Sequence, residues 1–219
     1  MSRLKQRIKT IDVLIVGCGL AGLRAAQAAS EKGVAVAIVA KGDGATPEII
    51  GFNAPVAIDD SAKIFFDDIL RGGVYLSNRI LARIMAEEAE KAVKDLERIG
   101  MHFDTENGHY NLLQPLGCTY PRCVHYGNVT GLEARKRILK KIVDNGVVVL
   151  QDIMITHLFA SEGKIFGGSG IDMKNGDFLA FCASAVILAA GGCGTLYPFT
   201  TYPFDISCDG YAMAYQIGA

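Results

Sequence analysis

Two short apolar runs, separated by an alanine-rich segment, open the chain. Residues 13–16 (VLIV) and 34–39 (VAVAIV) are entirely apolar, and residues 20–30 (LAGLRAAQAAS) have the composition of a helix that ends before Lys32-Gly33. Continuous apolar runs of this length are typical of parallel strands that are buried on both faces. The order of strand, helix and strand therefore predicts a βαβ unit.

A long amphipathic segment follows a region rich in glycine. Residues 42–77 are predicted to be mostly loop, with a short helix around residues 63–70. Residues 78–99 have the apolar spacing of a helix, and Gly100 ends it. The stripe predicted to be buried consists of Leu81, Ile84, Met85, Ala89, Ala92, Val93, Leu96 and Ile99.

Another helix and two strands are predicted after residue 129. Thr130 and Glu133 have the spacing of a capping box, which predicts a helix that runs to Asp144. Residues 147–150 and 153–159 are apolar and are predicted to be strands.

A hairpin signal interrupts the alternation of strands and helices. Strands are predicted at residues 164–173 and 177–182, joined by Asn175-Gly176, and a further apolar strand is predicted at residues 184–190. A nicotinamide-binding Rossmann half would continue with βαβ repeats, so this inserted β-meander points away from that class.

Composition limits the kinds of partner. The chain has 219 residues, of which 50% are hydrophobic and 21% are charged, so it is long enough for one large domain. Its net charge of -1 gives no general attraction to nucleic acid or to anionic lipid. No apolar run approaches 18 residues, so we expect no transmembrane segment.

The first residues and the cysteines bear on localisation. The start is basic, but the apolar stretch after it is broken by glycines and lacks a clean cleavage site, so it is interpreted as a strand and loop rather than a secretory signal. The six cysteines form no C-x-x-C pair. A reducing, cytoplasmic setting is the simplest expectation.

A glycine fingerprint lies between the first predicted strand and helix. Gly17, Gly19 and Gly22 have the spacing G-x-G-x-x-G, in which the loop and the helix N-terminus bind a pyrophosphate. Cys18, inside this loop, fits a buried thiol. Chance spacing in an ordinary turn is the alternative, and the fingerprint does not distinguish FAD from nicotinamide dinucleotides.

Six further stretches carry a family resemblance. They are VGCGLAGLRAA at 16–26, VAKG at 39–42, residues 65–103, GNVTGLEARKRIL at 127–139, AVILAAGGCGTLYPFTT at 185–201 and CDGYAMAYQIGA at 208–219. With these stretches the chain resembles the flavoprotein subunits of the succinate dehydrogenase, fumarate reductase and L-aspartate oxidase family. The resemblance implies an α/β, Rossmann-like FAD-binding domain over residues 1–219, with a parallel sheet and an inserted antiparallel β-meander.

The resemblance also implies a set of FAD contacts. The pyrophosphate would lie on the glycine loop, the ribose beside the end of the second strand, and the adenine against a strand of the meander, while the segment from Thr46 would run toward the flavin. In chain order the implied residues are Gly17, Cys18, Gly19, Leu20, Ala21, Gly22, Ala40, Lys41, Gly42, Thr46, Asn53, Ala54, Ile153, Ala190, Gly191 and Asp209.

Several positions depart from the family pattern. Ala40-Lys41 stands where an acidic residue normally binds the ribose hydroxyls. Asn53-Ala54 stands where the family usually has a pair of glycines, and A-T-G-G and G-D-G are A-A-G-G and C-D-G here. Residues 43–60 contain no histidine, whereas covalent members of the family attach the flavin through one. We therefore expect non-covalent FAD.

The family moves a hydride between flavin N5 and a dicarboxylate, using residues of a capping domain and a C-terminal return that follow the G-D-G motif. We expect both to be absent from this chain, so it would bind a dicarboxylate-like substrate only with the missing cap, and no catalytic residue is assigned. Arg122 and His125 could suit a carboxylate, although a packing role in their loop is favoured. His102, His109 and His157 form no metal-ligand pattern, and no metal is expected.

Three functions follow from these observations. The first is the FAD-binding part of a flavin-dependent oxidoreductase, with a possible partner subunit supplying the cap or electron transfer. The second is a non-catalytic FAD-binding or interaction subunit. The third, a nicotinamide dehydrogenase, is disfavoured by the meander and by Asp209. Exposed apolar surface is expected where a cap would dock.

Overall fold

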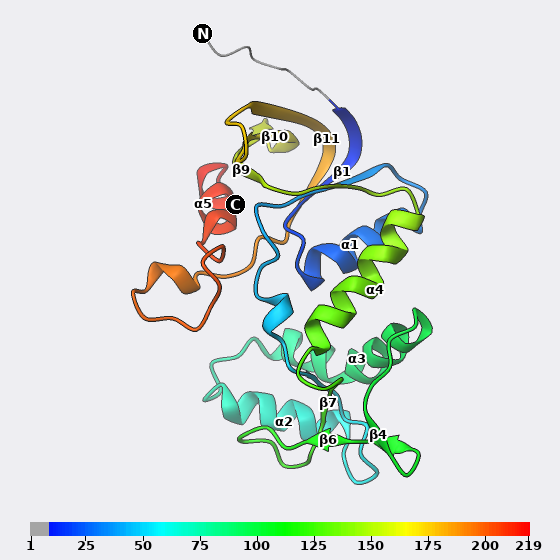
Figure 1. The fold of residues 1–219 in the computed structure, drawn as a ribbon. Coiled ribbons are helices and arrows are strands. Elements are labelled where there is room, and N and C mark those ends of the chain that lie inside the picture. The colour runs from blue at the N-terminus through cyan, green and yellow to red at the C-terminus, as the bar shows by residue number, and fades with distance from the viewer. Residues whose placement is uncertain (1–8) are drawn as a thin grey trace. The chain divides into compact units, whose positions relative to one another are not determined.

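The computed structural model describes residues 9–219, which form two compact units (Figure 1). The first unit contains the described part of Met1–Pro47 together with Ile138–Ala219. The second contains Glu48–Arg137. The glycine fingerprint and Asp209 thus belong to the same unit, although they lie at opposite ends of the sequence.

A six-stranded sheet forms the first unit. Its strand order is β8-β2-β1-β11-β10-β9, in which β8, β2, β1 and β11 are parallel and β11, β10 and β9 are antiparallel. The strands are β1 (Lys9–Val16), β2 (Val36–Val39), β8 (Val148–Leu150), β9 (Ile153–Ser161), β10 (Lys164–Asp172) and β11 (Phe178–Leu188). The expected parallel sheet with an inserted antiparallel meander is confirmed.

Strand β11 corrects one boundary of the sequence analysis. The two strands predicted at residues 177–182 and 184–190 are a single strand, which pairs with β10 through Phe178–Cys182 and with β1 through Phe181–Leu188. No turn signal separates the two stretches, so one extended segment can lie in both ladders. The meander is therefore continuous with the parallel sheet.

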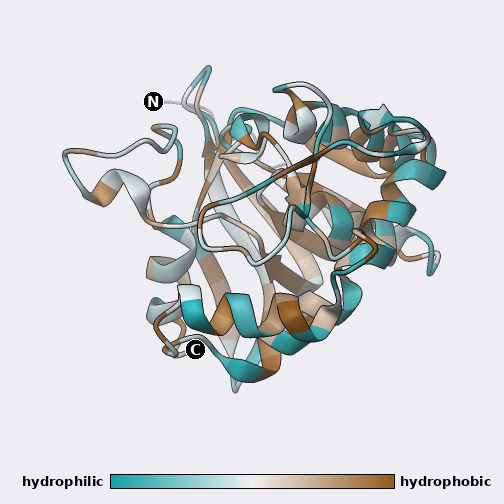
Figure 2. Ribbon diagram, turned by 90° about the horizontal axis from the view of Figure 1, so that it is seen from below, coloured by the Kyte–Doolittle hydropathy of each residue, from teal (hydrophilic) through white to brown (hydrophobic). Residues whose placement is uncertain are grey.

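Apolar strands and a small helix form the core of this unit. Leu14, Ile15, Ile38 and Val39 are fully buried, as the all-apolar runs predict. Figure 2 shows these central strands as largely hydrophobic, whereas the helices carry both colours. Helix α1 (Leu20–Ser30) lies against β1 and β2 and connects them.

The remaining elements of the first unit follow the strands at their carboxyl ends. A 3-10 turn, η1, covers Thr46–Glu48, and a second, η2, covers Gly194–Leu196. Helix α5 (Asp209–Gln216) follows η2 and contributes Met213 to the buried cluster that contains Ile153.

The second unit is built mainly from helices α2 (Ala62–Gly72) and α3 (Arg79–Arg98). Its short strands were not predicted, because two residues are too few to show a period: they are β3 (Phe52–Asn53), β4 (Thr105–Glu106), β5 (His109–Tyr110), β6 (Leu112–Leu113) and β7 (Cys123–Val124). β7 pairs with both β3 and β6.

The buried face of α3 differs from the predicted stripe in its first half. Ala82 and Ala86 are buried, whereas Leu81 is 64% exposed and Ile84 and Met85 are more than half exposed. The alanines face inward because α2 packs closely on α3, and small side chains permit that approach. Val93 and Leu96, in the second half, are buried as predicted.

Helix α4 (Thr130–Asp144) has the predicted bounds but not the predicted capping box. Thr130 is its first residue, and its hydroxyl donates to the Ile50 carbonyl (2.5 Å) and accepts from the Tyr126 N–H (2.9 Å). Glu133 instead accepts from Arg137 Nε (2.6 Å). The Thr130 hydroxyl therefore joins two loops of the second unit.

Candidate FAD site

The loop between β1 and α1 can be built only with glycine at two positions. Gly17 has φ +112°, and a Cβ there would lie 2.2 Å from the Ala189 carbonyl oxygen. A Cβ on Gly22 would lie 2.0 Å from the Gly17 carbonyl oxygen. The fingerprint glycines therefore permit a tight turn and a close contact between helix and strand, as a dinucleotide loop requires.

The N-terminus of α1 points its first amides out of this loop. Gly19 is the N-cap and offers no side chain, and the Leu20 N–H donates instead to Thr46 Oγ1 (3.0 Å). Thr46 is buried, so a residue expected near the cofactor lies at the helix start. The amides of Ala21 and Gly22 are in the first turn, whose N–H groups lack acceptors within a helix and attract an anion.

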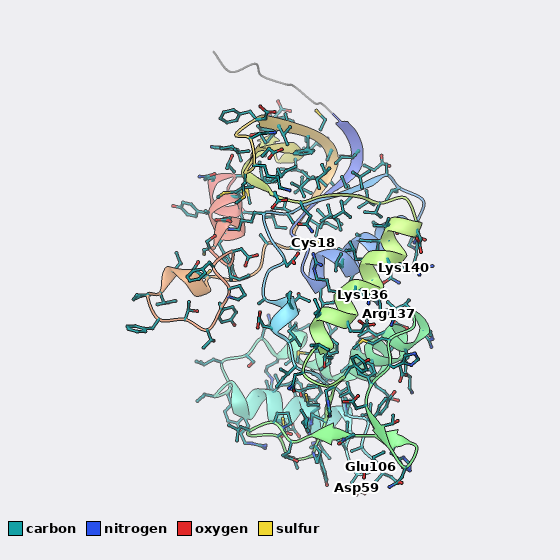
Figure 3. All side chains as sticks on the ribbon, in the orientation of Figure 1. Cys18, Asp59, Glu106, Lys136, Arg137 and Lys140 are labelled. Atoms are coloured by element: carbon teal, nitrogen blue, oxygen red, sulfur yellow. The ribbon has the colours of Figure 1, made fainter. Side chains whose placement is uncertain are left out.

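Cys18 is held inside the loop. It is almost fully buried, and Gln151 Nε2 lies 3.7 Å from its sulfur. Figure 3 shows it between β1 and α1. Its burial agrees with the predicted structural role of this thiol.

The end of β2 is fixed by backbone hydrogen bonds. The Ala40 N–H donates to the Leu150 carbonyl (2.9 Å), and the Ala40 carbonyl accepts from the Ile153 N–H (3.0 Å). Ile153 is thereby placed next to the ribose-side residue Ala40, and its role in holding the adenine stays a prediction.

Lys41 and Asp209 form an ion pair across this edge of the sheet. Lys41 Nζ donates to Asp209 Oδ2 and to Ser207 Oγ, and Ser207 Oγ donates to Asp209 Oδ1 (3.2 Å). The side chains of Lys41 and Asp209 are 19% and 21% exposed. The lysine that replaces the usual acidic residue thus meets an acidic residue from the C-terminal segment.

The loop after Lys41 is tied to the same C-terminal segment. The Gly44 N–H donates to Asp205 Oδ2 (2.8 Å), and a Cβ on Gly42 would lie 2.3 Å from that oxygen. Asp205 and Ser207 were missed by the sequence analysis. The only signal was their position, since both are polar and lie within four residues of Asp209.

Ala190 and Gly191 form the turn after β11. Gly191 has φ +78°, and a Cβ on it would lie 3.1 Å from Ile206 Cδ1. The Ala190 Cβ lies 3.1 Å from the position of a Cβ on Gly210. Small residues are required here because the turn packs against the start of α5.

These groups gather at the carboxyl ends of three neighbouring parallel strands. The glycine loop follows β1, Ala40 to Gly42 follow β2, and Ala190-Gly191 follow β11. Ligands of open α/β sheets bind at this edge. A backbone cradle, an uncapped helix N-terminus and paired charges fit a dinucleotide such as FAD.

The remaining two predicted contacts lie in the second unit. Asn53 stands opposite Cys123 in the pairing of β3 with β7. Ala54 is fully buried, and its N–H donates to the Arg122 carbonyl (2.8 Å). Their contact with the cofactor stays a prediction.

Arg122 is the centre of a buried charge cluster in the second unit. Its guanidinium is fully buried, with Nη2 2.8 Å from Asp68 Oδ2 and 3.1 Å from Asp60 Oδ1, and it lies over the Phe65 ring at 4.7 Å. Burial alone would raise the pKa of Asp68, but hydrogen bonds from Thr119 and the charge of Arg122 outweigh it and lower that pKa. Arg122 is thus paired within its own unit.

His125 is also buried and lies beside a carboxylate. Its Nδ1 is 3.1 Å from Asp104 Oδ2, and its carbonyl accepts from the Asp104 N–H (2.7 Å). The other three histidines, His102, His109 and His157, are exposed.

Residues 9–219 show neither a metal centre nor a membrane span. No group of three or more His, Cys, Asp or Glu side chains among them could hold a metal ion. None of the helices in this part of the chain is both long enough and apolar enough to cross a bilayer.

Curated proteins and solved structures match nearly the whole chain. The large flavoprotein chain of the fumarate reductase (CoM/CoB) of Methanothermobacter marburgensis is 34% identical over 99% of this chain and 41% of its own length. Chloroplastic L-aspartate oxidase of Oryza sativa subsp. japonica is 30% identical over 96% of this chain and 34% of its own length.

Among solved structures, the Mycobacterium smegmatis Sdh1 complex in the apo form has a chain that superimposes with a TM-score of 0.92 at 34% identity, over 99% of this chain and 40% of that one. The fold and the cofactor class expected from the sequence are therefore confirmed.

The chain spans about two fifths of the length of these relatives. The family model described as FAD binding domain matches residues 12–219. That match begins just before the glycine loop and includes every FAD contact expected from the sequence. This chain therefore belongs to the FAD binding domain family, with the flavoproteins of fumarate reductases, succinate dehydrogenases and L-aspartate oxidases as its relatives.

Proposed function

We propose that this chain is the FAD-binding part of an oxidoreductase that transfers a hydride between the flavin and a dicarboxylate-like substrate. The observation that carries the proposal is the cradle at the carboxyl edge of the sheet, where Gly17 and Gly22 leave no room for a side chain. FAD, when bound, supplies the hydride chemistry, and the protein supplies binding and orientation.

The residues of the first unit have distinct roles in this proposal. The first-turn amides of α1 bind the pyrophosphate, since they combine hydrogen-bond donors with the positive end of the helix dipole. Lys41 and Asp209 bind polar groups of the cofactor beside the end of β2. Thr46 fixes the helix start by accepting from the Leu20 N–H. Residues 43–60 contain no histidine, which supports a non-covalent flavin.

Substrate binding and electron transfer are assigned to protein outside these 219 residues. The matched relatives include a protein named as a subunit of fumarate reductase, and this chain covers 41% of it. A partner subunit or a further segment would supply the carboxylate-binding groups and the electron partner. Arg122 supports this division, since both carboxylates that it contacts belong to its own chain.

Purification tests the cofactor assignment. We expect a yellow protein with a flavin spectrum, from which acid releases FAD into the supernatant. Flavin that stays with the precipitated protein would contradict the non-covalent assignment. A colourless protein that binds NADH would overturn the proposal.

An activity assay tests the division of labour. With reduced viologen as the electron donor, we expect no fumarate reduction by this chain alone. Robust turnover would show that the catalytic groups lie within residues 1–219.

A non-catalytic FAD-binding subunit is the second candidate. The observation in its favour is that Arg122 and His125, the two side chains suited to a carboxylate, are buried against acidic residues. Co-expression with the reading frame that follows distinguishes the two candidates. Fumarate reduction by the co-purified complex supports the oxidoreductase, and a flavin-loaded complex without turnover supports the second candidate.

A further inference from the structure

Two cysteines that are distant from each other in the sequence meet in the C-terminal segment of the first unit. Cys193 lies directly before η2 and Cys208 directly before α5. The Cys208 N–H donates to the Gly192 carbonyl (3.1 Å). The Thr195 N–H (3.0 Å) and hydroxyl (2.8 Å) donate to the Ile206 carbonyl. The chain is therefore cross-tied on both sides of the cysteine pair.

The thiols of Cys193 and Cys208 are hydrogen-bonded to each other. Both residues are partly exposed, in contrast to Cys18 and Cys123, which are buried. A small molecule in solvent can therefore reach this thiol pair. The backbone hydrogen bond from Cys208 to the neighbour of Cys193 holds the two Cα atoms within the range that a disulfide spans.

We propose that Cys193 and Cys208 form a reversible disulfide by exchange with a low-molecular-weight disulfide such as oxidised glutathione. In the first step the thiolate of one cysteine attacks the small disulfide, forms a mixed disulfide and releases one small thiol. In the second step the other thiolate attacks the protein sulfur of the mixed disulfide and releases the second small thiol. The two protein thiols lose two protons and two electrons, and the small disulfide is reduced.

The rate of this exchange depends on pH. The hydrogen bond from Cys193, partial burial and the nearby charge of Asp209 raise the pKa of Cys208. Because the thiolate is the reacting form, exchange is slow at neutral pH and becomes faster as the pH rises.

The disulfide would close a ring on residues that shape the edge of the sheet. The ring contains Asp205 and Ser207, which bind Gly44 and Lys41, and Asp209 follows it directly. Closing the ring restricts this segment in every state of the chain. The proposed modification therefore fixes the contacts between the C-terminal segment and the loop after β2.

Peptide mapping of the full chain tests the proposal. The reduced protein is treated with oxidised glutathione, quenched with an alkylating reagent and digested with chymotrypsin. Phe199 and Phe204 are 95% and 94% exposed and lie inside the ring, so cleavage there separates the two cysteines along the chain. We expect a cross-linked pair of peptides that contains both cysteines, disappears on reduction and forms at least several-fold faster at pH 9 than at pH 7.

Cys182 is the internal standard, because it is exposed and lies in β11. The reaction is followed until Cys182 is fully glutathionylated. A Cys182→Ser variant should still form the cross-link, whereas Cys193→Ser should leave a stable glutathione adduct on Cys208. The proposal is overturned if, at that point, wild-type Cys193 and Cys208 are still alkylated as thiols or carry separate glutathione adducts.

Discussion

The two units use charge in opposite ways. In the second unit, Arg122, Asp60 and Asp68 form a cluster whose side chains are almost completely excluded from water. In the first unit, Lys41 and Asp209 are each about one fifth exposed and lie at the edge where the cofactor loop ends. One cluster joins loops inside its unit, whereas the other is open to a ligand.

Burial decides what each arrangement can do. A buried ion pair is expensive to break, because removing one partner leaves the other charge without water. A pair that is partly solvated can exchange a partner at small cost. We therefore expect the Arg122 cluster to control stability, and the Lys41–Asp209 pair to affect cofactor binding more than stability.

Arg122→Met gives the largest expected effect. It leaves Asp60 and Asp68 buried without their cation, so the free energy of unfolding should fall by about 3–5 kcal/mol. Chemical unfolding followed by circular dichroism measures this. The matched control is Arg98→Met, which removes a surface pair with Asp95 and should cost about 0.5 kcal/mol. Equal losses in the two variants would contradict the difference between buried and open charge.

Gly17→Ala tests whether the first unit depends on backbone geometry instead. The residue has φ +112° and its Cβ would overlap the Ala189 carbonyl, so we expect a loss of about 3 kcal/mol and of bound flavin. Gly33→Ala is the control, since Gly33 also has positive φ but an added Cβ meets open space. It should cost about 1 kcal/mol and retain flavin. Thermal unfolding and the flavin-to-protein absorbance ratio report both quantities.

The charged cluster of the second unit should also show itself in the pH dependence of stability. Because the folded protein lowers the pKa of Asp68, its stabilising contribution is present above the unfolded pKa of about 3.9 and is lost as the pH falls through the folded value. Asp68→Asn should therefore lower the free energy of unfolding at pH 7 by about 2 kcal/mol, and this difference should shrink below pH 4.

The exposed neighbour Asp67 provides the control for this measurement. It pairs only with Lys63 at the surface in the described structure, so Asp67→Asn should leave the pH profile close to that of the wild type. A difference between wild type and Asp68→Asn that is constant from pH 7 to pH 2 would show that the Asp68 charge is not the cause.

The smallest effect on stability is expected for Asp209→Asn. Its partner Lys41 stays partly solvated, so the free energy of unfolding should change by less than about 1 kcal/mol. The Kd for FAD should nevertheless rise about tenfold, the effect of losing one charge-assisted contact. Fluorescence titration of the apoprotein with FAD measures the Kd.

Asp152→Asn is the matched control for the titration, because it also breaks a lysine pair, with Lys174, on the same unit. It should leave the Kd for FAD unchanged. An unchanged Kd in Asp209→Asn would remove Asp209 from the cofactor site.

The sequence predicts the first unit well, because its signals are local. The apolar runs of β1 and β2, the alanine-rich helix α1 and the Asn175-Gly176 turn each specify an element without reference to distant residues. The glycine fingerprint could be assigned for the same reason, since its required backbone conformation is encoded by the missing side chains.

Contacts between distant segments could not be predicted in the same way. Nothing local indicates that Thr46 accepts from the Leu20 N–H or that Asp205 binds the Gly44 N–H. The inward face of α3 was also mistaken, because Leu81 looks buried until the alanine face is seen to pack on α2. In each case the partner is chosen by tertiary packing, which a periodic pattern does not contain.

The pairing of β1 with β11 has a consequence for how the protein is made. Val16 is opposite Leu188, so the central ladder joins one of the first segments to leave the ribosome to one of the last. The ladder with β2 can form early, but the other edge of β1 stays unpaired until about 170 further residues have been synthesised. Long-range pairing of this kind is slow, and an open strand edge favours aggregation. During synthesis, β1 is therefore the segment for which a chaperone would matter most.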